Sequence, residues 1–117
     1  MNNFKELKVW QKAIELSVLM YKTTKNFPTD EKFGLVSQIN RCSVSISSNI
    51  AEGAGRNNKK EFRQFLGIAQ GSCYELESQT ILSNKLEFIS DEKLEEIGAI
   101  INEVNKMIHG LKKSLEN

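Results

Sequence analysis

The sequence predicts an all-α protein folded as an antiparallel, up-down-up-down four-helix bundle. Apolar residues recur at alternating spacings of three and four along four separate stretches, which is the period of a helix face packed against other helices. Short turn segments separate the stretches, so consecutive helices are expected to run antiparallel. A chain of 117 residues suits one domain, spanning residues 1–117, and no stretch shows the alternation of a strand.

The first predicted helix spans residues 5–25 and carries two apolar sets. Together they cover about 200° of the helix surface, roughly twice what a helix buried on one side needs. We therefore expect the surplus face to be buried against another subunit, in a ring. One set comprises Leu7, Trp10, Ile14, Val18 and Tyr21. The other, which we assign to the oligomer interface, comprises Val9, Ala13, Leu16 and Met20.

The second predicted helix spans residues 29–54, after a turn at Pro28. Its apolar and small residues lie at Val36, Ile39, Ser43, Ile46, Ile50 and Gly53. Serines are middling helix formers, so tertiary packing must hold this helix, and small side chains let a neighbouring helix approach closely. Gly53 and Gly55 are expected to take the left-handed backbone that ends a helix.

Side-chain caps mark the starts of the last two helices. Asn58 precedes the third helix, with Glu61 three residues later as in a capping box, and the helix is expected to end between residues 83 and 88. Ser90 precedes the fourth. An unbroken heptad pattern then follows at Leu94, Ile97, Ile101, Val104, Ile108, Leu111 and Leu115.

Charge is distributed unevenly along the chain. Residues 1–63 carry a formal charge of +5 and residues 64–117 carry −4. The up-down topology brings the first helix's start, the turn near Arg56 and the fourth helix's end to one pole. We name this the basic pole and predict that it contacts nucleic-acid phosphates, the alternative being that its side chains are merely solvated. Its residues are Lys5, Lys8, Lys12, Arg56, Lys59, Lys60, Arg63, Lys112 and Lys113.

Several function classes find no support in the composition. No segment approaches the ~20 apolar residues of a membrane span, so a cytoplasmic protein without a membrane partner is expected. The single histidine, His109, has no partner at ligand spacing, and the serines have no nearby base. We therefore expect no enzyme activity, no metal and no cofactor.

The runs RCSVSISSNIAEGAGR at 41–56 and EFxxFLxIAxGSxxELE at 61–77, preceded by LKVWQKA and FPxxE, carry a resemblance. The chain resembles the bacterial four-helix bundle family encoded in intervening sequences of 23S ribosomal RNA genes. The resemblance implies a homopentamer with RNA, DNA or a nucleic-acid enzyme as partner, because related proteins include the pentameric accessory factor of diversity-generating retroelements, which associates with a reverse transcriptase and its RNA. It also implies a polar signature at Arg41, Asn49, Glu52, Gly53, Ser72 and Glu75.

Antiparallel pairing of the second and third helices predicts which of their residues lie level. Glu52 should face Arg63, and Arg41 should lie near Glu75. Such groups either form a polar pocket or, as we favour, set the register between the helices. Cys42 should lie level with Cys73, where a disulfide is conceivable but two buried thiols are favoured.

The sequence therefore predicts a non-enzymatic, oligomeric binding or scaffold protein that meets RNA or DNA through the basic pole. The alternative is an oligomeric adaptor that binds another protein and makes no direct nucleic-acid contact. Loss of binding with rising salt would favour the first, because neutralised phosphates release counterions.

Overall fold

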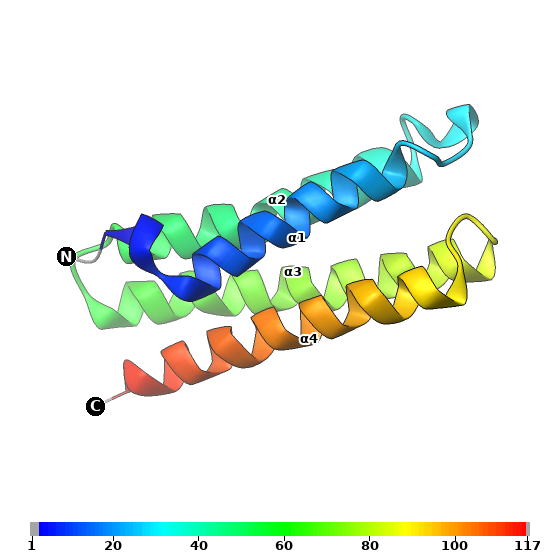
Figure 1. Ribbon diagram of the computed structural model, residues 1–117. Helices are drawn as coiled ribbons and strands as arrows, with labels where there is room; N and C mark the ends of the chain where they lie inside the picture. Colours follow the sequence, from blue (N-terminus) through cyan, green and yellow to red (C-terminus); the bar gives the residue numbers. More distant parts are fainter. Residues whose placement is uncertain (1–2, 117) are drawn as a thin grey trace.

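Four long helices run alternately up and down in the computed structural model, which describes residues 3–116 (Figure 1). This confirms the predicted four-helix bundle, which measures 46 × 23 × 20 Å. Two 3₁₀ turns precede the first two helices. The elements in order are η1 (Phe4–Glu6), α1 (Lys8–Thr24), η2 (Thr29–Glu31), α2 (Leu35–Ala54), α3 (Lys59–Lys85) and α4 (Asp91–Ser114).

The helix starts agree with the sequence for α3 and α4 but not for α1 and α2. The Asn58 side chain accepts a hydrogen bond from the Glu61 backbone N–H at 2.7 Å, and Ser90 Oγ accepts one from the Lys93 N–H at 3.0 Å. The first helix is interrupted at Leu7, where the backbone is extended. The second begins at residue 35 instead of 29, after Gly34, because glycine disfavours the helix interior.

The turn between α2 and α3 corrects one prediction about glycine and supports another. Gly55 has φ −80°, and no glycine in the described chain has positive φ, so the left-handed ending is wrong. Gly53 instead stays inside α2, where an added Cβ would lie 2.8 Å from Phe65 Cβ and 2.9 Å from Phe62 Cδ1. The small residue is needed because α3 passes so close.

The buried face of α1 is the set that we had assigned to an oligomer interface. Val9, Ala13, Leu16 and Met20 are at most 5% exposed and belong to the core of the single chain, so that assignment is wrong. Ser17, on the same face, donates a hydrogen bond to the Ser43 backbone oxygen of α2 at 3.0 Å. These contacts leave no room for a second subunit there.

The other apolar set of α1 points outward. Ile14, Val18 and Tyr21 are 37%, 47% and 48% exposed. Trp10 is half-buried, with its ring 5.1 Å from that of Phe4 in an edge-on arrangement. The helical period joins both sets into one broad apolar arc, and the bundle buries the half that carries Ala13, Leu16 and Met20 and leaves the half with Ile14, Val18 and Tyr21 accessible.

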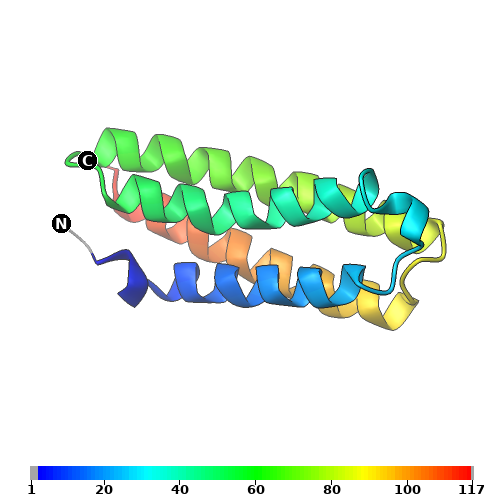
Figure 2. The ribbon, with the colours of Figure 1, turned by 90° about the horizontal axis from the view of Figure 1, so that it is seen from above.

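The arrangement of the helices places three separate parts of the chain at one end. Figures 1 and 2 both show the start of η1, the α2–α3 turn and the end of α4 there, with the α1–α2 and α3–α4 turns at the opposite end. The predicted grouping of these segments is thus confirmed. α2 and α3 pack most extensively against each other, and α1 and α4 least.

Candidate nucleic-acid interface

The basic pole divides into exposed lysines and side chains that are already bonded within the chain. The exposed lysines carry no ion pair to any of residues 3–116. They come from η1, α1, α3 and α4, at the end of the bundle where the start of η1, the α2–α3 turn and the end of α4 meet (Figure 2). They are Lys5, Lys8, Lys59, Lys60 and Lys113.

Arg56 is held by its own chain. Its guanidinium lies 2.9 Å from a Glu52 carboxylate oxygen and 3.6 Å from one of Glu61, and 5.0 Å above the ring of Phe65. No ion pair joins Glu52 to Arg63 in the described chain, because the Arg56 side chain folds back one turn and takes that carboxylate. This cluster fixes the α2–α3 turn that carries the lysines at positions 59 and 60.

The remaining predicted basic residues are also engaged or partly covered. Lys12 lies 3.4 Å from Glu103 of α4 and 4.0 Å from Glu15. Lys112 donates a hydrogen bond to Gln70 at 3.0 Å. Arg63 is half-buried, and its Nε has no hydrogen-bond partner in the described chain. These side chains contribute positive charge to the pole but are less free to reach a ligand.

The opposite end of the bundle carries charges of both signs. Its seven acids are Asp30, Glu31, Glu87, Asp91, Glu92, Glu95 and Glu96. Its five lysines are Lys22, Lys25, Lys32, Lys85 and Lys93. The two ends therefore differ in charge, but the contrast comes mainly from the lysines of the basic pole.

The polar signature residues lie largely along the contact between α2 and α3. Ser72 is buried, its hydroxyl oxygen lies 2.6 Å from Ser45 Oγ, and its backbone oxygen accepts a hydrogen bond from the Cys42 thiol at 3.1 Å. The Asn49 side chain bonds within α2, to the Ser45 backbone oxygen at 2.7 Å. These bonds satisfy buried polar groups and fix how the two helices meet.

Arg41 and Glu75 lie at the outer edge of this contact. Both are exposed, and both line a hollow of about 560 Å³ together with Phe33, which is 89% exposed. No ion pair joins the two charged groups in the part of the chain that is described. They are therefore accessible surface groups at the edge of the buried contact between α2 and α3.

The two cysteines are free, buried thiols, as favoured from the sequence. Burial raises the pKa of Cys42 from 9.0 to about 12, and the nearby Glu75 carboxylate adds to the shift. Burial likewise raises the pKa of Cys73 to about 12, with a smaller contribution from Glu77. Both thiols are protonated at neutral pH and are poor nucleophiles.

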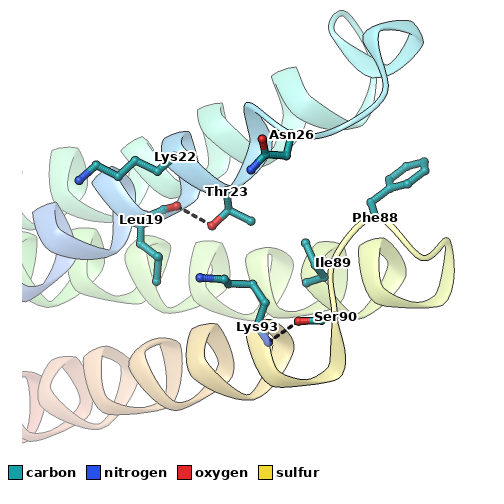
Figure 3. A pocket seen from close by; sticks show the side chains of 8 residues that line it. All are labelled: Leu19, Lys22, Thr23, Asn26, Phe88, Ile89, Ser90 and Lys93. Atoms are coloured by element: carbon teal, nitrogen blue, oxygen red, sulfur yellow. Dashed lines mark hydrogen bonds between the residues drawn. The ribbon is translucent and has the colours of Figure 1, made fainter.

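A cleft between α1 and α4 lies at the end opposite the basic pole (Figure 3). It has a volume of about 350 Å³, and Leu19 and Ile89 supply apolar surface. Lys22 and Lys93 approach it from the two helices, but Lys93 Nζ is bound to Glu96 at 2.8 Å. The Thr23 hydroxyl donates to the Leu19 backbone oxygen at 2.7 Å. Most of its polar groups are thus used within the chain.

A second cleft, which we name the α3–α4 cleft, was missed from the sequence. It has a volume of about 380 Å³, and no carboxylate lines it. The sequence did carry one sign of this cleft: positions 102, 105, 106 and 109 lie on one face of α4 and include no acidic residue. Its lining residues are Gln70, Tyr74, Asn102, Asn105, Lys106, His109 and Gly110.

Residues 3–116 contain neither a cluster of metal ligands nor a helix that could span a membrane. No group of three or more His, Cys, Asp or Glu side chains lies close enough together to hold a metal ion. No helix in the same part of the chain is both long and apolar enough to cross a membrane.

Residues 5–110 match the family described as 23S rRNA-intervening sequence protein. A solved structure with the same fold is a protein of unknown function from the S23 ribosomal protein family of Bacteroides thetaiotaomicron VPI-5482. It is 29% identical, with a TM-score of 0.83, and the alignment covers 90% of this chain and 95% of that one. No curated protein matches the chain.

Proposed function

The chain belongs to the 23S rRNA-intervening sequence protein family, and on this premise we propose that it is a non-enzymatic, self-associating protein that binds the backbone of RNA or DNA through its basic pole. The observation that carries the proposal is the set of five exposed lysines at one end of the bundle, from the η1–α1 segment, the start of α3 and the end of α4.

The start of α3 strengthens the basic pole as an anion site. Lys59 and Lys60 occupy the first turn of the helix, next to the Glu61 N–H that Asn58 caps, where the helix dipole favours a phosphate. Arg56 and its carboxylate partners hold the preceding turn in place. A backbone ligand would thus meet exposed lysines on a fixed turn and gain affinity without base specificity.

The test is a salt titration of binding to a structured RNA and to duplex DNA. The test variant carries both Lys59→Gln and Lys60→Gln. The matched control carries both Lys22→Gln and Lys25→Gln, at the other end of the bundle. Each double variant removes two exposed positive charges, so the net charge of the protein changes equally. Each lysine removed from the interface should lower the slope of log affinity against log salt by about 1.

The expected result is a weaker, less salt-dependent complex for the first variant and an unchanged one for the second. Equal losses in both variants would mean that net charge, and not the basic pole, determines binding. Absence of binding to either nucleic acid at low salt would overturn the proposed function and leave the protein-binding adaptor as the alternative.

Self-association is the second part of the proposal, now on the outward face of α1. Ile14, Val18 and Tyr21 are exposed, and Tyr21 shares a hollow with Phe33 and Val44 of the neighbouring α2 side. Contiguous exposed apolar surface of this kind often marks a protein interface. The number five comes from the resemblance alone, and the ring is part of the proposal.

Light scattering tests this face directly. Ile14→Glu combined with Val18→Glu should reduce the particle mass to that of a monomer, because two carboxylates would be buried at the interface. Ile14→Leu with Val18→Ile keeps the face apolar and should leave the mass unchanged. A wild-type chain that is already monomeric at micromolar concentration would refute the assembly.

A further inference from the structure

We propose that the α3–α4 cleft binds an unpaired nucleobase, so that the protein's preferred partner is single-stranded nucleic acid. The inference rests on the proposed function and deepens it, because the basic pole alone would accept any phosphate backbone. The α3–α4 cleft adds the groups that a base requires, and it lies beside the lysines of α4.

The first argument is the aromatic wall. Tyr74 is 62% exposed and lines the α3–α4 cleft from α3. An exposed tyrosine ring offers a face on which a base can stack, and stacking tolerates any base. Bases inside a duplex are already stacked on one another, so only an unpaired or splayed base can use this surface.

The second argument is the donor and acceptor set that α4 places across from α3. Asn102 and Asn105 of α4 supply amide groups, which both donate and accept hydrogen bonds as the edge of a base does, and Gln70 adds a third amide one turn before Tyr74 on α3. The Asn105 Oδ1 atom is buried and has no hydrogen-bond partner in the described chain. Amides and an aromatic ring in one cleft, without a carboxylate in its lining, suit a polar and planar ligand that carries negative charge nearby.

The third argument is continuity with the basic pole. Lys106 and His109 line the α3–α4 cleft, and Lys113 follows Lys106 by two helical turns on the same face of α4. Lys112 is bonded to Gln70 at 3.0 Å, which ties the last turn of α4 to the lining of the α3–α4 cleft. A strand whose base occupies this cleft could therefore lay its phosphates toward the exposed lysines.

The nearby carboxylates set a direction. Glu77 follows Tyr74 by one turn on α3, away from the basic pole. Glu103 neighbours Asn102 in sequence but is bound to Lys12 of α1 at 3.4 Å. Glu77 therefore leaves negative charge beyond the end of the α3–α4 cleft that is remote from the lysines, and a strand is expected to leave the cleft toward the basic pole.

The experiment measures binding of 12-nucleotide single-stranded RNA, the same sequence as DNA, and the matching duplexes, by fluorescence anisotropy. Tyr74→Ala should weaken single-strand binding by about tenfold, within the range for loss of one stacked base. The salt slope should stay unchanged, because no phosphate contact is lost. Tyr74→Phe keeps the ring and should bind as the wild type does.

A second variant blocks the α3–α4 cleft without removing any group from it. A Cβ added at Gly110 meets nothing within 4 Å, so Gly110→Leu can place its side chain in this space and should improve α4 as a helix. It should reduce single-strand binding and spare duplex binding. Gly98→Leu, also in open space on α4 but outside the lining, is the matched control.

The outcomes separate this inference from the proposed function. The base site would be overturned by equal affinity for single strands and duplexes. It would also be overturned if the Tyr74→Ala and Gly110→Leu variants bind as the wild type does. In either case the variant at Lys59 and Lys60 still tests the basic pole. Loss of the salt slope in Tyr74→Ala would also overturn it, because a backbone contact would then be responsible. RNA tighter than DNA, or the reverse, identifies the natural class of strand.

Discussion

Helix α3 meets its two neighbours in different ways. Against α2 it packs through Gly53 and through buried bonds at Ser72, so closely that an added Cβ would be 2.8 Å from a neighbouring atom. Against α4 it leaves a cleft lined by Tyr74 and amide side chains. The α2–α3 contact, where the sequence motifs lie, therefore fixes the register of the two helices. The accessible polar and aromatic side chains lie instead on the α4 side of α3, at positions that no motif specifies.

The largest expected effect compares two aromatic residues of α3. Phe62 is 1% exposed and packs beside Gly53, so Phe62→Ala should lower the free energy of unfolding by about 3–5 kcal/mol. Tyr74→Ala, on the side facing α4, should change it by about 0.5 kcal/mol or less. Urea denaturation measures both. Similar losses would show that the two faces do not differ in packing.

High pH should destabilise the folded protein through its two buried thiols. Because burial raises the pKa of Cys42 and Cys73 to about 12, the folded state holds these protons more tightly than the unfolded state. The associated stability is complete below about pH 9 and is lost as pH rises towards 12, by up to about 1.4 kcal/mol per pH unit for each thiol.

Urea denaturation between pH 8 and 11, compared with the double variant Cys42→Ala with Cys73→Ala, isolates this contribution. The wild type should lose stability faster than the variant. Parallel curves would contradict the raised pKa values. The native thiols should also react slowly with a thiol reagent at pH 8, because both are buried and protonated.

One substitution should have opposite signs on the two sides of α3. Gly53→Ala forces Phe65 Cβ or the α3 backbone to move and should cost about 1–3 kcal/mol, despite the better helix propensity of alanine. Gly110→Ala meets open space and should add about 0.5–1 kcal/mol. Thermal denaturation of both variants gives the signs; a stabilised Gly53→Ala variant would contradict the close approach.

The smallest effect concerns hydrogen bonds. Removing either hydroxyl of the Ser45–Ser72 pair should cost about 1 kcal/mol, and the double variant should cost less than the sum, because the second change finds no partner left. Gln70→Ala, which breaks the partly exposed bond to Lys112, should cost less than Ser72→Ala. Additive serine losses would mean that the two hydroxyls do not interact.

The fold was predictable because local signals agreed. Asn58 and Ser90 occur as caps, and the apolar residues of α4 at positions 97, 101, 104 and 108 are all buried. The orientation of α1 was not predictable from periodicity, since two apolar sets share one arc and only packing decides between them. Ser17 lies on the Val9 side of α1, and only the structure shows that its hydroxyl bonds to α2 and that this side faces inward.

The candidate site was predictable only in part. Topology brought the lysines to one end, but spacing does not tell which side chains fold back onto their own helix, as Arg56 does. The α3–α4 cleft required the structure, because its residues come from two helices distant in sequence. Tyr74 by itself lies on the outside of a helix and gives no signal of a partner.

Gly53 sets how closely the α2 and α3 helix axes approach each other. The nearest atom to its missing methyl group is a Cβ, which every residue except glycine carries, so no smaller side chain at position 65 short of glycine relieves the contact. Any replacement at position 53 must therefore shift the helix axis itself. Because Lys59, Lys60 and Tyr74 all lie on α3, such a shift would move the three side chains together. A single methyl group added in the interior would thus displace the whole proposed binding surface.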